Sequence, residues 1–139
     1  MAEQAYFEDY NEGDSIPEVS KNPSTQQLVQ WAAGSGDFYQ IHYDQDFARD
    51  TGLNGIIVHG ALKHAFLGDL LHRFAGPEGR VNRVACSYRG MDVPAKEYTL
   101  KGTVTRKYTE GEKNYVELEI WGENAEGQKT TPGTGAVTL

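Results

Sequence analysis

The chain has 139 residues, a formal net charge of −7 and 38% apolar residues. This length suits one domain, and we expect a single domain over residues 1–139 with one modest core. The acidic charge argues against a nucleic-acid partner, because such proteins present a basic face. The single cysteine, Cys86, excludes an intrachain disulfide framework and any multi-cysteine metal site.

No N-terminal apolar run has the form of a signal peptide, and no stretch approaches the roughly 20 apolar residues that span a bilayer. We therefore expect a cytoplasmic protein that does not contact a membrane. An anionic ligand stays compatible with the negative charge, because a local cluster of Arg and Lys can oppose the overall field.

The first half of the chain predicts short helices separated by turns. Residues up to about 21 predict a lead-in with one short strand. Asn22-Pro23-Ser24-Thr25 has the capping residues and the proline of a helix start, and the glycines of Gly34-Ser35-Gly36 end that helix. A loop over residues 37–42 follows, and a second short helix runs from residue 44 to about residue 50.

The clearest helix is predicted from His59 to Phe74. Apolar residues recur there at three- and four-residue spacing, small residues lie among them, and Gly76-Pro77 ends the helix. The apolar stripe consists of Leu62, Phe66, Leu67, Leu70, Leu71 and Phe74.

After this helix the pattern changes to alternation, which predicts antiparallel strands. The first strand has Val84, Cys86 and Tyr88 on one face, and two more follow over about 98–106 and 116–121. A last strand over about 129–139 is weaker, because Pro132 and two glycines interrupt it. Helices followed by a four-strand meander indicate an α+β fold whose sheet wraps round the long helix.

Asp37 and His42 are the sharpest chemical feature of the sequence. A carboxylate and an imidazole on one short loop can converge on one water molecule. The carboxylate can accept a proton from this water, and the imidazole can orient the water or pass a proton on. The alternative is that Asp37 caps a turn and His42 is a surface or helix-start residue. Spacing alone favours this alternative, because isolated Asp/His pairs are frequent.

Val58-His59-Gly60-Ala61 is the second feature. Gly60 stands at the predicted helix start, where backbone N–H groups are unpaired. Such a group, helped by the helix dipole, can polarise a thioester carbonyl and stabilise the oxygen that becomes enolate-like. The alternative is that Gly60 only allows close packing and His59 only caps the helix.

The two features in series resemble one known family. Ser-Gly-Asp-Phe-x-x-Ile-His-x-Asp, followed some fifteen residues later by Ile-Val-His-Gly-Ala-Leu, resembles the MaoC-like or (R)-specific enoyl-CoA hydratases. The resemblance extends from about residue 26 to residue 71. It continues more loosely through residues 88–94, which resemble the family's strand-and-proline turn.

The resemblance implies a hot-dog fold, in which an antiparallel sheet wraps round the helix over 59–74, and a dimer whose sheets join edge to edge. It implies that Asp37 and His42 are the catalytic pair that holds water, and that the Gly60 N–H binds the thioester oxygen. The implied reaction is syn addition of water to a 2-enoyl-CoA, which gives an (R)-3-hydroxyacyl-CoA. No metal or redox cofactor is implied.

Six further residues are expected to line the substrate site. Two depart from the family, since Tyr39-Gln40 replaces the usual Asn-Pro and puts the loop geometry and substrate choice in question. Lys63 replaces an apolar residue and faces either CoA phosphates or solvent, with solvent favoured. The set is Tyr39, Gln40, Ile57, Val58, His59 and Lys63.

Three other functions remain open. The chain can be the catalytic subunit of a two-subunit hydratase for bulky enoyl-CoA, such as steroid side-chain thioesters, with a hetero-partner of the same fold. It can be a non-catalytic acyl-CoA-binding subunit. It can also be a hot-dog acyl-CoA thioesterase, whose acid usually lies on or near the long helix, although Asp69 lies near the far end.

Overall fold

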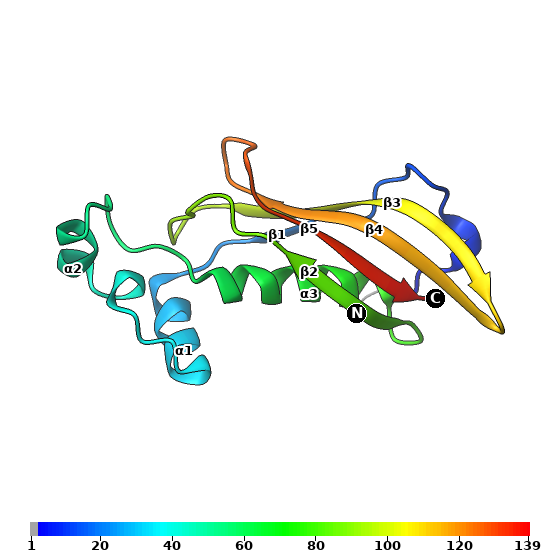
Figure 1. Ribbon diagram of the computed structural model, residues 1–139, viewed down its shortest axis with the longest axis horizontal. Helices are drawn as coiled ribbons and strands as arrows, with labels where there is room; N and C mark the ends of the chain where they lie inside the picture. Colours follow the sequence, from blue (N-terminus) through cyan, green and yellow to red (C-terminus); the bar gives the residue numbers. More distant parts are fainter. Residues whose placement is uncertain (1–2) are drawn as a thin grey trace.

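A curved antiparallel sheet lies over one long helix in the computed structural model, which describes residues 3–139 (Figure 1). The strands are β1 (Val19–Lys21), β2 (Arg80–Cys86), β3 (Tyr98–Glu110), β4 (Lys113–Glu123) and β5 (Lys129–Thr138). The helices are α1 (Thr25–Ser35), α2 (Gln45–Asp50) and α3 (Gly60–Ala75), with short 3₁₀ turns η1 (Phe7–Asp9) and η2 (Gln40–His42). The predicted hot-dog arrangement is confirmed.

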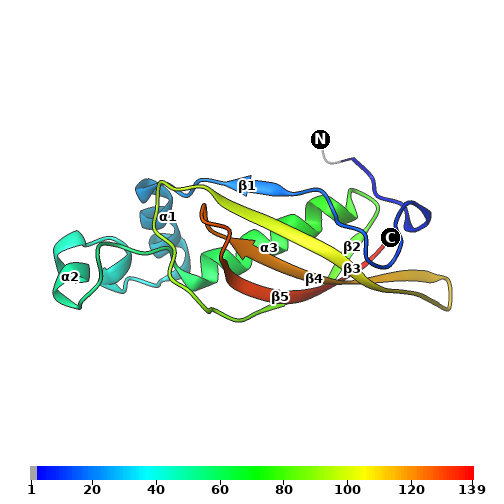
Figure 2. The same ribbon diagram turned by 90° about the horizontal axis from the view of Figure 1, so that it is seen from above.

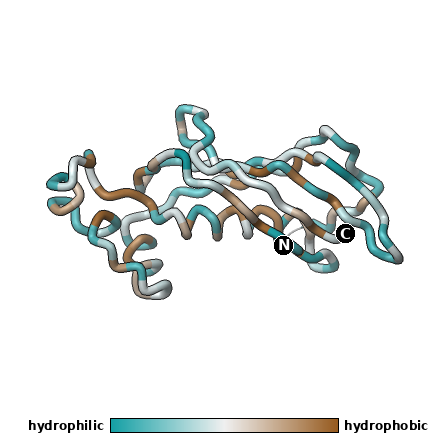
Figure 3. The backbone as a smooth tube through the Cα atoms, in the orientation of Figure 1, coloured by the Kyte–Doolittle hydropathy of each residue, from teal (hydrophilic) through white to brown (hydrophobic). Residues whose placement is uncertain are grey.

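The long helix α3 forms the centre of the core. Leu67, Leu70 and Leu71 are almost completely buried, as the spacing of the apolar stripe predicts. They contact apolar residues of β3, β4 and β5 in one cluster. Seen from above, the strands cross over α3 while α1 and α2 lie beyond one end of it (Figure 2). Apolar residues follow α3 and the strands above it, whereas the tip of the β3–β4 hairpin is polar (Figure 3).

The short helices begin and end where their capping residues predict. The Ser24 side chain accepts a hydrogen bond from the Gln27 N–H at the start of α1, and Gly36 ends it in the left-handed region at φ 79°. Asp44 caps α2 in the same way, by accepting the Phe47 N–H at 3.0 Å. These caps fix both ends of the loop that carries Asp37 and His42.

The predicted four-strand meander is wrong in one respect. The sheet order is β1-β3-β4-β5-β2, so β2 pairs with β5 at the edge and not with β3, its successor in the chain. The chain must therefore return across the sheet from β2 to β3. Residues 87–97 make this return and pass the start of α3 (Figure 1); we call them the crossover segment.

The last strand is more regular than its sequence predicts. Pro132 and Gly135 lie within β5, which pairs with β4 on one side and β2 on the other. Gly135 has a packing role, because a Cβ there would lie 2.4 Å from Leu71 Cδ1 of α3. The residues that weaken the strand pattern thus allow the helix to approach the sheet closely.

Among the described residues, no helix combines the length and the hydropathy needed to cross a bilayer.

Two glycine substitutions of opposite sign test this packing. Gly135→Ala should lower the free energy of unfolding by about 1–3 kcal/mol, because the new methyl group overpacks a core with no free space. Gly34→Ala should raise it by about 0.5–1 kcal/mol, because the site lies in α1 with open space around it and alanine favours the helix. Urea unfolding curves would measure both. A Gly135→Ala variant as stable as the parent would contradict the proposed contact.

Candidate active site

The loop between α1 and η2 places the Asp37 carboxylate. Its Oδ1 accepts the Tyr39 N–H at 3.3 Å, and the Asp37 N–H donates to Ser35 Oγ at 3.2 Å. This is an Asx-type turn, in which an aspartate bonds the backbone two residues ahead. One carboxylate oxygen is therefore used to shape the loop, and the side chain stays half exposed at 45%.

His42 lies at the end of η2 and is buried. Its Nδ1 donates to the Ile57 carbonyl at 2.8 Å, and the Ile57 N–H donates to Ile41 O at 3.1 Å. Because a carbonyl oxygen can only accept, Nδ1 carries the proton and the Nε2 of the neutral ring has a free lone pair. The neighbouring backbone thus orients the imidazole.

Asp37 and His42 face each other as the sequence predicts. The second carboxylate oxygen, Oδ2, lies 3.8 Å from His42 Nε2. This separation is too long for a direct hydrogen bond, yet it allows one water molecule to bond to both atoms. The pair can therefore hold and polarise a water molecule.

His59 contacts both Asp37 and His42. It is completely buried, its ring stacks on the His42 ring at 3.8 Å between centroids, and its Nε2 donates to the Asp37 carbonyl at 3.3 Å. Burial and then the neighbouring His42 lower the pKa of His59 below its usual 6.5. His59 is therefore a neutral residue of the site floor, and its contacts are with the Asp37–His42 pair.

Gly60 is the first residue of α3, directly after His59. The first amides of a helix have no partner within the helix, and the positive end of the helix dipole lies there. A Cβ at this position would lie 3.2 Å from the Tyr88 ring, so the crossover segment passes close to the Gly60 backbone. The Gly60 N–H therefore belongs to the unpaired amides at the start of α3, and the Tyr88 ring packs against the Gly60 backbone.

Three of the expected substrate-binding residues lie close to this pair. Tyr39 is exposed, and its ring meets the His42 ring edge-on at 6.3 Å; Gln40 is exposed beside it. Ile57 contacts His42 through its carbonyl, as described above. Val58 is buried and forms part of the wall of a separate cavity of about 120 Å³.

Lys63 is buried, so the prediction that its side chain faces solvent is wrong. It is 2% exposed, and its Nζ lies 2.8 Å from Asp92 Oδ2 in the crossover segment. The physical reason is its place on the helix: three residues before Phe66 and four before Leu67, Lys63 shares the buried face of α3. The sequence contains this signal, because the same spacing defines the apolar stripe.

Tyr88 and Asp92 of the crossover segment were not predicted as site residues. Tyr88 covers Gly60, and Asp92 lines the 120 Å³ cavity together with Val58, Lys63 and Tyr98. An aspartate between Met91 and Val93, in an otherwise apolar stretch, is the one local signal that pointed to a buried partner. Whether Asp92 lies near Lys63 depends on the order of the strands in the sheet, and the local sequence pattern does not predict that order.

Asp37, His42 and His59 also have the ligand types that bind divalent metals. One ligand atom from each lies within 4.8 Å of the others. The expectation that the site uses no metal or cofactor therefore stays a prediction, which chelation would test.

The fold and the matching sequence region define a class. The structure is a hot-dog domain, and residues 11–120 match the sequence profile described as the MaoC like domain. The chain belongs to the MaoC-like domain family.

Three known proteins are similar to this chain in sequence or in fold. The fatty acid synthase beta subunit TOXC of Cochliobolus carbonum is 34% identical over 93 residues, which are 66% of this chain and only 4% of that protein. The (R)-hydratase from A. caviae involved in PHA biosynthesis superposes with a TM-score of 0.83 at 24% identity, over 94% of this chain and 97% of the other. A chain of the ChsH1-ChsH2 complex from Mycobacterium tuberculosis superposes with 0.80 at 20% identity, over 93% and 98%. The two structures share the fold.

The lowered pKa of His59 predicts a dependence of stability on pH. Above about pH 6.5 the ring is neutral in both the folded and the unfolded chain. As the pH falls through that value, the unfolded chain takes up a proton that the buried ring resists, so folding is progressively disfavoured until the lower folded pKa is reached. Between about pH 7 and pH 5 the parent should lose more Tm than His59→Phe, which keeps the ring without the titrating group. Equal losses in differential scanning fluorimetry would contradict this role of His59.

Proposed function

We propose that the protein is an enoyl-CoA hydratase, which adds water reversibly to a 2-enoyl thioester and gives an (R)-3-hydroxyacyl-CoA. The observation that carries the proposal is the 3.8 Å gap between Asp37 Oδ2 and His42 Nε2, beside the start of α3. A water molecule that bridges these two atoms has two acceptors for its protons. An acyl thioester whose carbonyl binds at Gly60 presents its double bond to that water.

In the proposed reaction the Asp37–His42 pair accepts and returns one proton. The water oxygen bonds to C3 while the Asp37–His42 pair accepts one of its protons. The electron pair of the C2–C3 double bond moves toward the thioester oxygen, and the Gly60 N–H stabilises the charge that develops there. The enolate then takes the same proton back at C2 from the pair. One water molecule is added, and addition of both parts from one face gives the syn product.

The family and the relatives support this substrate class. Membership of the MaoC-like family, and the fold shared with an (R)-hydratase, favour hydration of an enoyl thioester. Because the chain corresponds to 4% of the fatty acid synthase beta subunit, that protein supports only acyl thioester chemistry in general. A role as the catalytic subunit for a bulky enoyl-CoA, with a hetero-partner of the same fold, is the second candidate. The fold shared with a chain of the ChsH1-ChsH2 complex favours it.

Thioesterase chemistry is less well supported by the geometry. Asp69, the one acid on α3, lies nine residues after Gly60, or about 13 Å along the helix. Its Oδ2 is bound by Lys21 at 2.7 Å and Arg73 at 2.9 Å, and although burial alone would raise its pKa, these two cations lower it. Asp69 therefore acts as an ion-pair partner.

We also propose that the protein forms a homodimer through β2. Among residues 3–139, β2 pairs with β5 on one side only, so its other edge offers backbone groups to a second strand. Edge-to-edge pairing of two such sheets satisfies these groups. Sedimentation of the purified protein would measure the state.

The first test is loss of enoyl absorbance with the purified protein alone. Crotonyl-CoA and a bulkier enoyl-CoA should lose their conjugated absorbance without release of free thiol, and chelation with EDTA should not change the rate. Release of thiol would indicate a thioesterase. A rate abolished by EDTA and restored by a divalent metal would overturn the metal-free mechanism. Inactivity with every substrate would favour a missing partner subunit.

Substitution of the pair tests the roles. Asp37→Asn and His42→Ala should each lower kcat by about 100- to 10,000-fold, because each removes a group that exchanges protons with the water. Asp46→Asn, on the exposed start of α2, is the matched control and should keep normal turnover. Circular dichroism would confirm that all three variants fold. Near-normal turnover in Asp37→Asn or His42→Ala would remove that residue from the mechanism.

A further inference from the structure

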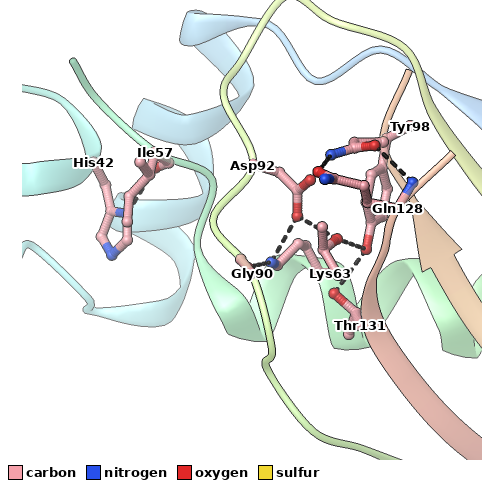
Figure 4. Close-up of polar contacts among 10 residues, drawn as sticks. His42, Ile57, Lys63, Gly90, Asp92, Tyr98, Gln128 and Thr131 are labelled. Atoms are coloured by element: carbon pink, nitrogen blue, oxygen red, sulfur yellow. Dashed lines mark hydrogen bonds and ion pairs between the residues drawn. The ribbon is translucent and has the colours of Figure 1, made fainter. Parts of the chain in front are cut away.

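Two opposite charges are buried together at the start of α3. Lys63 and Asp92 are 2% and 7% exposed, and Lys63 Nζ lies 2.8 Å from Asp92 Oδ2. Thr130 Oγ1 of β5 donates to the same oxygen at 2.7 Å. Figure 4 shows the Lys63 side chain reaching from α3 to the Gly90–Asp92 stretch, with Tyr98 and Thr131 on the side away from His42. The ion pair therefore joins the helix, the crossover segment and the sheet.

Stability alone does not account for this pair. Removing two charges from water costs about as much as their attraction returns, and apolar residues of similar shape commonly serve as well or better. The buried neighbours on α3 are Leu62, Phe66 and Leu67, so an apolar residue at position 63 would continue the stripe. An ion pair differs from such packing by being directional, which makes it suited to fixing a position.

The crossover segment is bonded on both sides of the His59–Gly60 turn. Before the turn, the Val58 N–H donates to the Asp92 carbonyl at 2.8 Å. After the turn, Lys63 Nζ donates to the Gly90 carbonyl at 2.9 Å and to the Asp92 carboxylate. Gly60 lies between these two fixed points, so its N–H direction is set relative to the crossover segment.

The same segment carries the ring that covers Gly60. Tyr88 lies 3.2 Å from where a Gly60 Cβ would be, and the Gly90 N–H donates to Thr130 O of β5 at 3.1 Å. The ring that packs on Gly60 and the bonds that hold its turn thus belong to one stretch of chain. A movement of this stretch would shift the amide and this ring together.

We propose that Lys63 and Asp92 are positioning residues, which hold the Gly60 N–H in the direction needed to bind the thioester oxygen. The inference rests on the proposed hydratase function. An amide that stabilises charge mainly in the transition state affects kcat more than KM. Small misplacement of such a group is costly, since an error of about 1 Å can lower a rate by about 100-fold.

The test is a double variant in which the pair becomes apolar. Lys63→Met with Asp92→Leu keeps the side-chain shapes, and the adjoining 120 Å³ cavity accommodates the leucine, so the chain should fold. We expect kcat for crotonyl-CoA to fall by about tenfold or more with KM within about threefold of the parent. Amide hydrogen exchange at Val58, followed by NMR, should become about tenfold faster, because its acceptor is the backbone of residue 92 and loosens with the segment.

A second, partly exposed ion pair serves as the control. Lys21→Met with Asp69→Leu removes a 2.7 Å pair that joins β1 to the far half of α3, and it should leave kcat and Val58 exchange unchanged. Normal kcat, or normal Val58 exchange, in a folded Lys63→Met/Asp92→Leu variant would overturn the inference. If the parent itself hydrates no enoyl-CoA, the proposed function fails, and the exchange rates alone decide whether the pair positions this turn.

Discussion

The structure depends on the burial of one helical stripe against a curved sheet. Leu67, Leu70 and Leu71 of α3 are enclosed by strands whose glycines allow the backbone to approach, as Gly135 does beside Leu71. This contact buries the apolar stripe of α3 against the inner face of the sheet, and burial of apolar surface is the main force that favours folding. At the start of α3 the helix is covered by loops and no longer by the sheet (Figure 1), so the helix surface can carry polar residues there. The candidate site lies where the sheet ends and these loops begin.

Backbone groups hold much of the site. His42 is oriented by the Ile57 carbonyl, His59 by the Asp37 carbonyl and Val58 by the Asp92 carbonyl. Such contacts do not depend on the identity of the side chains around them. This explains how the loop keeps its turn with Tyr39-Gln40 in place of the family's Asn-Pro: the Asp37 carboxylate and the Tyr39 backbone make the bond.

Features with a local signal could be predicted from the sequence. The 3.6-residue period located α3 to within one residue, and the capping residues located α1 and α2. The alternating pattern located β3 and β4 but placed the first strand too late in the chain, because β2 ends at Cys86 and Tyr88 lies in the crossover segment. The closeness of Asp37 and His42 followed from one short loop. The edge position of β2 and the Lys63–Asp92 pair could not be predicted, because both depend on how distant segments meet. Lys63 also shows how a residue type misleads: its charge favoured solvent, while its spacing indicated the buried face.

The position of the Asp37–His42 loop has a consequence for how the protein loses activity. The loop and α2 lie beyond the end of the sheet (Figure 2). Three hydrogen bonds link the loop to the chain before α3: the carbonyl groups of Ile41 and Asp37 accept two of them, and His42 donates the third. Opening of this unit exposes much less apolar surface than separation of α3 from the strands, so it requires less free energy. The geometry of the candidate site should therefore be lost at a lower temperature than the global fold. A ligand that bridges the loop and the start of α3 would bring these two temperatures together.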